Sequence, residues 1–282
     1  MRRRRAVVLV LVLSGIVLLT VSLLGDLTSA GRYVSLPRRS WERFDPALAS
    51  RTPDLAALFR SAQERAGGRL GEIPHSQAME ILYGTVADRF THGDRARYNV
   101  FSNWALWLLG GLSPNRGYIQ DPDILLRNGH SALCGDVSHV LLRLAERSGI
   151  RARHVLLNGH IVMEAFYEGS YHAYDPDLEV TVRDKSGQVL SVRAAAADME
   201  LVLRAYAGRG DSEFIIAIGK ILGDTSDDVY LVYPPAGIFG ESGQRPGRVE
   251  QAARHVRYGL PVALLAAGCF FVRGDGRKGG EA

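Results

Sequence analysis

Apolar positions mark out the two ends of the chain before any other feature. Residues 6–24 are almost continuously apolar, and a helix of about 20 such residues crosses a bilayer. The arginines at residues 2–5 are expected to stay on the cytoplasmic side, because positive charges that flank a span are retained there. A cleaved secretory signal is the less favoured alternative, since its apolar region usually covers only about 7–15 residues. We therefore expect an N-terminal membrane anchor, with the main part of the chain on the extracytoplasmic side.

A second apolar run, residues 259–272, lies close to the C-terminus. It is short for a span and contains Pro261, which disfavours a regular helix. Arg257 and Arg273 flank the run, however, and long basic side chains can extend a short span by reaching toward the headgroups. We expect this run to cross the membrane and return the chain to the cytoplasm, while a single-pass topology stays open.

Between the two runs, apolar residues first recur with the 3.6-residue period of amphipathic helices. Thr52, Pro53 and Asp54 have the composition of a helix start, with Thr52 as the N-cap. The tryptophans of a later, very apolar helix, Trp104 and Trp107, are expected in the core. The expected helices cover residues 52–66, 76–90, 99–109, 135–147 and 194–206, and residues 215–222 fit either a helix or a buried strand.

After residue 150 the pattern changes to short runs rich in Val, Ile, Tyr and Phe. Turn residues such as Asn158 and Gly159 separate these runs. The expected strands cover residues 153–157, 160–167, 171–174 and 179–183, with further strands at 189–192 and 228–233. Such a meander after a helix predicts an α+β fold, in which the helix at 135–147 packs on an antiparallel sheet.

The composition fits one main domain with extensions at both ends. The chain has 282 residues, of which 46% are hydrophobic, so it can bury a substantial core. From the patterns above we expect a membrane anchor at 1–25, a linker at 26–51, a main domain at 52–242, a juxtamembrane segment at 243–258, the second apolar run at 259–272 and a basic tail at 273–282.

The positive charge of the chain is concentrated at its ends. The formal net charge is +4 and the pI is about 9.2, yet residues 25–258 are close to neutral. Nucleic-acid binding requires a basic patch on the folded domain, and this distribution does not indicate one. No nucleic-acid partner is expected.

Two cysteines occur in the chain, and only one belongs to the main domain. Cys269 lies in the C-terminal apolar run, so we expect no disulfide between it and Cys134. A lone thiol is uncommon in an exported domain, where cysteines usually pair. Cys134 also falls at the expected start of a helix, where unpaired N–H groups favour a thiolate. A reactive thiol is therefore the sharper reading, and a small buried hydrophobe is the alternative.

A histidine and an aspartate follow Cys134 at positions that complete a nucleophile site. His160 opens the second expected strand, and Asp175 ends the third. Neighbouring antiparallel strands can bring such ends together. An imidazole that removes the thiol proton, oriented by a carboxylate, makes a thiol an effective nucleophile. Taken singly, His160 also fits a core histidine, and Asp175 before Pro176 also fits an ordinary turn.

Residues upstream of Cys134 are candidates for the rest of the cleft. The oxyanion of an acyl-transfer intermediate requires two hydrogen-bond donors. We expect the backbone N–H of Cys134 as one donor and Gln120, Asn103 or Tyr118 as the other. His130 can line the same cleft.

Glu164 lies on the same face of its strand as His160, so it either supports the site or pairs with Arg153. The many histidines of this region also raise a zinc reading. Neither Cys-x-x-Cys nor His-Glu-x-x-His spacing occurs, so we expect no metal and no cofactor. The histidines concerned are His130, His139, His154 and His172.

Four segments between residues 133 and 176 match one family in their order and spacing. They are Leu-Cys-Gly-Asp at 133–136, Gly-Ile-Arg-Ala-Arg-His-Val at 149–155, the strand that His160 opens, and the segment at 171–176 that ends in Asp-Pro. Together they resemble the transglutaminase-like members of the papain-like cysteine fold. The resemblance implies a papain/transglutaminase-like core with Cys134 as nucleophile, His160 as base and Asp175 as orienting acid.

Two positions depart from that family's pattern. Many members have Trp directly after the cysteine and an aromatic residue two positions after the histidine. This chain has Gly135 and Val162 there. These positions shape the acyl site, and the family includes crosslinking acyltransferases, peptidases, amidases and inactive members.

The expected function is that of a membrane-anchored thiol enzyme of the transglutaminase-like type. It would attack peptide or protein amide bonds in the cell envelope and form a thioester, which water or an amine then resolves. The alternative is an inactive scaffold or binding module that works with envelope-assembly or exopolysaccharide-assembly proteins. In both cases we expect the cytoplasmic (inner) membrane as the location, with the site at Cys134 on its extracytoplasmic side.

Overall fold

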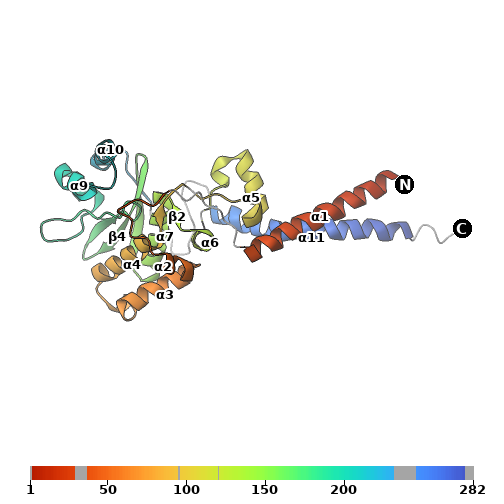
Figure 1. Ribbon diagram of the computed structural model, residues 1–282, viewed down its shortest axis with the longest axis horizontal. Helices are drawn as coiled ribbons and strands as arrows, with labels where there is room; N and C mark the ends of the chain where they lie inside the picture. The colour runs from red at the N-terminus through yellow and green to blue at the C-terminus, as the bar shows by residue number, and fades with distance from the viewer. Residues whose placement is uncertain (1, 29–36, 95, 120, 232–245, 277–282) are drawn as a thin grey trace. The chain divides into compact units, whose positions relative to one another are not determined.

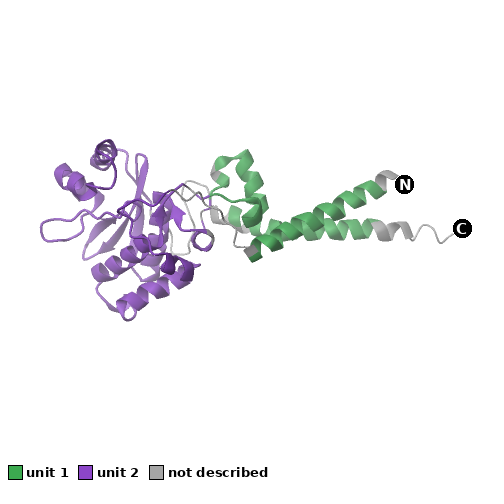
Figure 2. Cartoon of the chain, viewed as in Figure 1, with its two compact units in different colours: residues 1–32, 97–118, 246–282 green, residues 33–96, 119–245 purple. Residues whose placement is uncertain are grey.

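The N-terminal apolar run forms a single long helix, α1 (Arg2–Thr28), in the computed structural model (Figure 1). The structure describes residues 2–28, 37–94, 96–119, 121–231 and 246–276. The chain divides into two compact units (Figure 2). One comprises Met1–Arg32, Arg97–Tyr118 and Pro246–Ala282, and the other Tyr33–Ala96 and Ile119–Arg245.

In the first unit, α1 runs antiparallel to the C-terminal helix α11 (Pro246–Gly276) (Figure 1). Glycines allow this close approach: a Cβ at Gly15 would lie 2.8 Å from Leu265, and one at Gly268 would lie 2.5 Å from Val12. In the part of the chain that the structure describes, α1 is the helix long and apolar enough to cross a membrane. The run at 259–272 lies inside α11, so its crossing of the membrane stays a prediction.

The third helix of this unit, α5 (Val100–Leu112), packs against α1 and kinks at Asn103. Trp104 is buried and its Nε1 donates to Ser22 Oγ at 3.2 Å. Trp107 is 49% exposed, so the expectation of a core position was wrong for it. Both tryptophans follow the kink at Asn103, and Trp107 lies beyond the buried positions 103–106 of this helix. A short turn, η2 (Pro114–Arg116), follows α5.

The second unit begins with helices whose ends are fixed by local capping. Asp54 caps α3 (Leu55–Ala66) by accepting from Ala57 N at 2.7 Å, and Gly67 ends it with φ +68°. Thr52 instead follows the preceding helix, so the expected cap at Thr52 was wrong. The remaining helices of this part are α2 (Pro46–Arg51), η1 (Leu70–Glu72), α4 (His75–Arg89), α6 (Pro122–Asn128) and α7 (Cys134–Arg147).

A four-stranded antiparallel sheet with the order β5-β4-β3-β6 forms the centre of this unit. Its strands are β3 (Arg151–Leu157), β4 (His160–Tyr167), β5 (Ser170–Tyr174) and β6 (Val229–Leu231). The register pairs Val155 with Val162, and the tight turn before β4 uses Gly159 at φ +96°. The meander expected after α7 is confirmed, and the molecule is a mixed helix and sheet fold. Residues 232 and 233 of the last expected strand lie outside the described residues.

Helices cover both faces of this sheet. On one face α7 and α4 pack against the strands (Figure 1). On the other face Val155 and Val162 join an apolar cluster with α8 (Val192–Ala196), α9 (Met199–Tyr206) and α10 (Ser212–Gly223). The single helix expected at 194–206 is therefore two, and residues 215–222 are helical. The expected strands at 179–183 and 189–192 form only isolated bridges, which join Asp175 to Val180 and Arg183 to Val189.

A second, two-stranded sheet was not expected from the sequence. Here β1 (Thr91–His92) runs parallel to β2 (Ser131–Ala132), with His92 opposite Ala132. Two residues are too few to give a periodic signal, and the partners lie far apart in the sequence. This pairing anchors the segment that leads into α7.

Candidate active site

Cys134 is the first residue of α7, directly after β2. The residue before it, Leu133, contributes no side-chain cap, so the first turn of α7 presents its N–H groups without a capping side chain. Ser138 Oγ donates to the Ile161 carbonyl oxygen at 3.1 Å and so ties α7 to the beginning of β4. These contacts fix the thiol beside the first residue of that strand.

Gly135 explains how the helix can lie so close to β4. A Cβ at this position would lie 3.1 Å from Ile161 Cδ1, which is tighter than an ordinary contact. Any side chain at this position would press on the end of the Ile161 side chain. Gly135 therefore allows α7 to lie close to β4 at this point.

His160 and Asp175 form a buried hydrogen-bonded pair. His160 is the first residue of β4, Asp175 directly follows β5, and the antiparallel pairing of the two strands brings them together. His160 Nε2 lies 2.7 Å from Asp175 Oδ2, and a His160 ring nitrogen lies within 4.8 Å of Cys134 Sγ. Since Nε2 is taken by the carboxylate, Nδ1 is the nitrogen left for the thiol. The three residues expected to form a nucleophile site thus lie together, with His160 between Asp175 and Cys134.

The two buried partners shift each other's ionisation. Burial favours neutral His160, but the charge and hydrogen bond of Asp175, together with the contact to Cys134, outweigh it and raise the His160 pKa well above its ordinary value. Burial likewise acts to raise the pKa of Asp175, but His160 and two further hydrogen bonds lower it below its ordinary value. The Asp175 carboxylate therefore stabilises His160 as the imidazolium, which is the form that the ring takes once it has accepted the Cys134 proton.

Two of the groups that hold Asp175 come from residues that follow it in the chain. Tyr206 of α9 donates its hydroxyl to Asp175 Oδ2 at 2.9 Å, and the backbone N–H of Leu178 donates to Oδ1 at 3.1 Å. Tyr206 is buried, and burial and then the charge of Asp175 raise its pKa well above the ordinary value. It remains a hydroxyl donor at physiological pH. No local pattern pointed to Tyr206, because it lies far from the other site residues along the chain.

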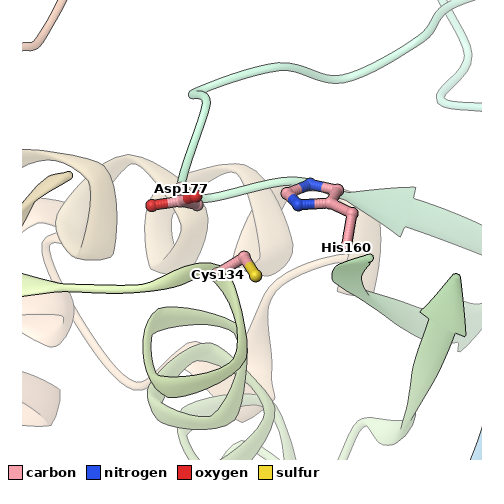
Figure 3. Close-up of side chains that lie close together, drawn as sticks. All are labelled: Cys134, His160 and Asp177. Atoms are coloured by element: carbon pink, nitrogen blue, oxygen red, sulfur yellow. The ribbon is translucent and has the colours of Figure 1, made fainter. Parts of the chain in front are cut away.

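A second acid, Asp177, lies on the other side of the thiol (Figure 3). One donor atom each from Cys134, His160 and Asp177 lies within 4.8 Å of the other two. Asp177 is buried, and its Oδ1 lies 2.9 Å from Nδ1 of His92 in β1. Burial raises the pKa of Asp177 above its ordinary value. Neither residue was a sequence candidate; the repeated acid in Asp-Pro-Asp at 175–177 is the one local signal for Asp177.

The other candidates of the sequence take different places. Glu164 is fully buried in β4, where it accepts from Arg153 Nε at 2.8 Å and from the backbone N–H of Val192 at 2.8 Å. Of its two expected roles, the pairing with Arg153 is confirmed. His130 stacks on Phe44 with ring centroids 4.7 Å apart.

The oxyanion donors expected upstream stay predictions. Gln120 lies outside the described residues, and Asn103 and Tyr118 belong to the first unit. The side-chain oxygen of Asn103 accepts from the backbone N–H groups of Ala105 and Leu106, at 3.1 and 3.2 Å. This contact caps the second half of α5.

Comparison with known proteins adds little to this geometry. No family model matches the chain, and no curated protein matches it. Among solved structures, one described as "Crystal structure of a TGase" matches 46% of this chain and 31% of that chain, at 15% sequence identity and a TM-score of 0.29. This chain therefore spans about a third of that structure, and at that TM-score the likeness does not establish a shared fold. What the protein does has to be argued from Cys134, His160 and the two acids beside them.

Proposed function

We propose that this chain is a membrane-anchored thiol enzyme of the transglutaminase-like type that acts on amide bonds. The observation that carries the proposal is the row of Cys134, His160 and Asp175, in which His160 hydrogen-bonds Asp175 and lies within 4.8 Å of the thiol. A buried imidazole that contacts a thiol on one side and a carboxylate on the other is the arrangement that thiol nucleophiles require. The alternative is an inactive scaffold module, and the position of His160 between the thiol and a buried carboxylate counts against it.

The arrangement accounts for both halves of an acyl transfer. His160 accepts the proton of the Cys134 thiol, and Sγ attacks the amide carbonyl carbon. The resulting oxyanion collapses, the C–N bond breaks, and the departing amine takes the proton from His160, which leaves a thioester on Cys134. Water or a second amine then gives its proton to His160 as it attacks the thioester, and that proton returns to the sulfur when the acyl group leaves.

Asp175 holds the His160 ring in place through these steps. Its hydrogen bond to Nε2 keeps Nδ1 directed at the thiol and stabilises the positive charge that the ring acquires. Tyr206 and Leu178 in turn fix both oxygens of Asp175. The backbone N–H of Cys134 at the start of α7 is the proposed oxyanion donor.

The membrane location follows from α1 and the charges that flank it. The helix is long and apolar enough to cross a bilayer, and a signal sequence passes the same test. We propose a retained anchor in the cytoplasmic membrane, with the arginines at 2–5 inside and the Cys134 site on the extracytoplasmic side. A peptide or protein amide of the cell envelope is then the proposed substrate.

Thiol alkylation tests the proposal without a known substrate. The full chain carrying Cys269→Ser, in detergent or nanodiscs, leaves Cys134 as its single thiol. At a pH of about 6.5, iodoacetamide should label Cys134 at least about tenfold faster than a model thiol, because an activated cysteine carries more thiolate there. His160→Ala should remove most of this advantage.

The matched control is His75→Gln, which changes an exposed histidine of the same unit and should label as the parent does. If Cys134 of the parent reacts no faster than the model thiol, the proposal is wrong. An equal rate in the parent and in His160→Ala would also contradict it.

A further inference from the structure

Asp177 is a buried acid for which the thiol mechanism has no use. Asp175 already orients His160, yet Asp177 lies within 4.8 Å of both Cys134 Sγ and a His160 nitrogen. Its side chain is almost fully buried, and His92 holds one of its oxygens from the opposite side. A carboxylate beside a nucleophilic sulfur opposes the thiolate that the chemistry requires, since like charges repel strongly where water is excluded. A divalent cation bound between the two groups would neutralise both charges.

The three atoms are the donor types that zinc prefers. Zn²⁺ binds thiolate sulfur at about 2.3 Å, imidazole nitrogen at about 2.0–2.1 Å and carboxylate oxygen at about 2.0–2.2 Å, usually with tetrahedral geometry. Those bond lengths separate neighbouring ligand atoms by about 3.4–3.6 Å. The donors of Cys134, His160 and Asp177 all lie within 4.8 Å of one another, so side-chain movements of about 1 Å bring them to that spacing.

The groups behind the donors are those of a zinc site. A ligating histidine usually passes its other N–H to a carboxylate, and ligating carboxylates are themselves hydrogen-bonded. Here His160 Nε2 faces Asp175 at 2.7 Å, and Asp177 Oδ1 faces His92 Nδ1 at 2.9 Å. Each of these contacts occupies one atom of the metal-binding side chain, so that His160 Nδ1 and the second carboxylate oxygen of Asp177 remain to bind a metal beside Cys134. In the described residues, this is the one group in which three His, Cys, Asp or Glu donors converge.

We propose that Cys134, His160 and Asp177 form a three-ligand site for a zinc-like divalent cation, and that occupancy silences the thiol. Binding displaces the thiol proton to solvent, forms a metal–sulfur bond and takes the Nδ1 lone pair of His160. The sulfur is then no longer a free nucleophile, and His160 is no longer a base. The fourth position of the tetrahedron stays open to water. Metal binding rests on the geometry alone, and the silencing rests also on the proposed function.

Cobalt provides the direct probe, because its bond to a thiolate gives a charge-transfer band in the near ultraviolet. The experiment titrates Co²⁺, and then competing Zn²⁺, into the chelator-treated full chain carrying Cys269→Ser. The proposal expects one equivalent of cobalt, a thiolate band that Cys134→Ser abolishes, and its displacement by zinc. Asp177→Asn should weaken binding by about tenfold or more, as losses around metal sites commonly do. Asp227→Asn, which changes an exposed acid of the same unit, should bind as the parent does.

Alkylation in the presence of zinc tests the silencing. Saturating Zn²⁺ should slow iodoacetamide labelling of Cys134 by at least about tenfold, and the same zinc concentration should protect Asp177→Asn far less. Should Asp177→Asn fold poorly by circular dichroism, His92→Gln provides a second variant, expected to weaken binding because Asp177 loses its outer hydrogen bond.

The outcomes separate the two proposals. Fast alkylation of the metal-free chain without a cobalt–thiolate band or zinc protection overturns the metal site and leaves the thiol enzyme standing. A cobalt band with slow alkylation of the metal-free chain supports the metal site and overturns the enzyme. Equal cobalt affinity in the parent and in Asp177→Asn also overturns the site, because Asp177 is then no ligand.

Discussion

Two buried histidines make the packing of the nucleophile helix sensitive to acid. His139 of α7 and His154 of β3 lie edge to face, with ring centroids 5.5 Å apart, where α7 rests on the sheet. Burial lowers the pKa of His154 to about 4, although a hydrogen bond to the Ser138 backbone acts in the opposite direction. Burial, and then the charges of His154 and Arg143, also lower the pKa of His139 well below its ordinary value. Both rings are therefore neutral in the folded protein.

The size of the loss in stability follows from the difference in the His154 pKa between the folded and unfolded states. An unfolded histidine has a pKa of about 6.5, so between about pH 6.5 and 4 the unfolded chain binds a proton that folded His154 does not. Stability therefore falls as the pH falls through this window. Between pH 7.5 and 5, His154 alone removes about 2 kcal/mol of the free energy of unfolding. For a unit of this size that corresponds to about 4–8 °C in melting temperature, and His139 adds to it in the same direction.

The assay compares variants across pH, because other acids of the chain also titrate in this range. Thermal unfolding of the full chain, followed by circular dichroism, gives the loss between pH 7.5 and 5 for the parent and for His154→Gln. The glutamine stays neutral, so the variant should begin less stable at pH 7.5 and lose about 2 kcal/mol less on acidification. His75→Gln should reproduce the slope of the parent. An unchanged slope in His154→Gln would refute the reasoning, because His154 would then titrate alike in both states.

Three further predictions concern packing, an ion pair and topology. Gly135→Ala should fold, since its Cβ crowds only the end of the flexible Ile161 side chain. Gly135→Trp should lower the free energy of unfolding in urea by about 2 kcal/mol or more. Equal stabilities of the two variants would contradict the packing described. Glu164→Ala should lower the free energy of unfolding by about 3 kcal/mol in the same assay, because Arg153 and the buried N–H of Val192 both lose their acceptor. A loss below about 1 kcal/mol would show that the ion pair contributes little. Alkaline phosphatase fused after Ala282 should be inactive if residues 259–272 cross the membrane, and high activity would rule that crossing out.

Much of the fold could be predicted where the signal is local. The helix at 135–147 and the strands after it were expected because burial imposes a period of 3.6 or 2 on neighbouring residues. The kink at Asn103 and the break between α8 and α9 were missed, since each replaces one expected helix by two shorter ones. The segments at 179–183 and 189–192 have the composition of strands, but a composition does not supply a pairing partner.

The residues of the candidate site also fall into those that local patterns reveal and those that they do not. A thiol at a helix start, a histidine opening a strand and an aspartate ending the next one can be found from the sequence, because each sits at an element boundary that local patterns mark. Tyr206, His92 and the approach of Asp177 to the thiol could not be found, since they depend on packing between segments far apart in the chain.

The sequence by itself determined the apolar N-terminal helix, the order of the helix and strands around the site, and the candidate residues Cys134, His160 and Asp175. Periodicity and residue type carry that information, because they act over a few residues. The tertiary structure alone decided that His160 lies between two acids, with Asp175 on its Nε2 and Asp177 beside the thiol. This arrangement depends on the register of β4 and β5, on the parallel pairing of β1 with β2 and on the hydrogen bond from Tyr206 of α9 to Asp175. These are long-range contacts, which only the folded chain can form.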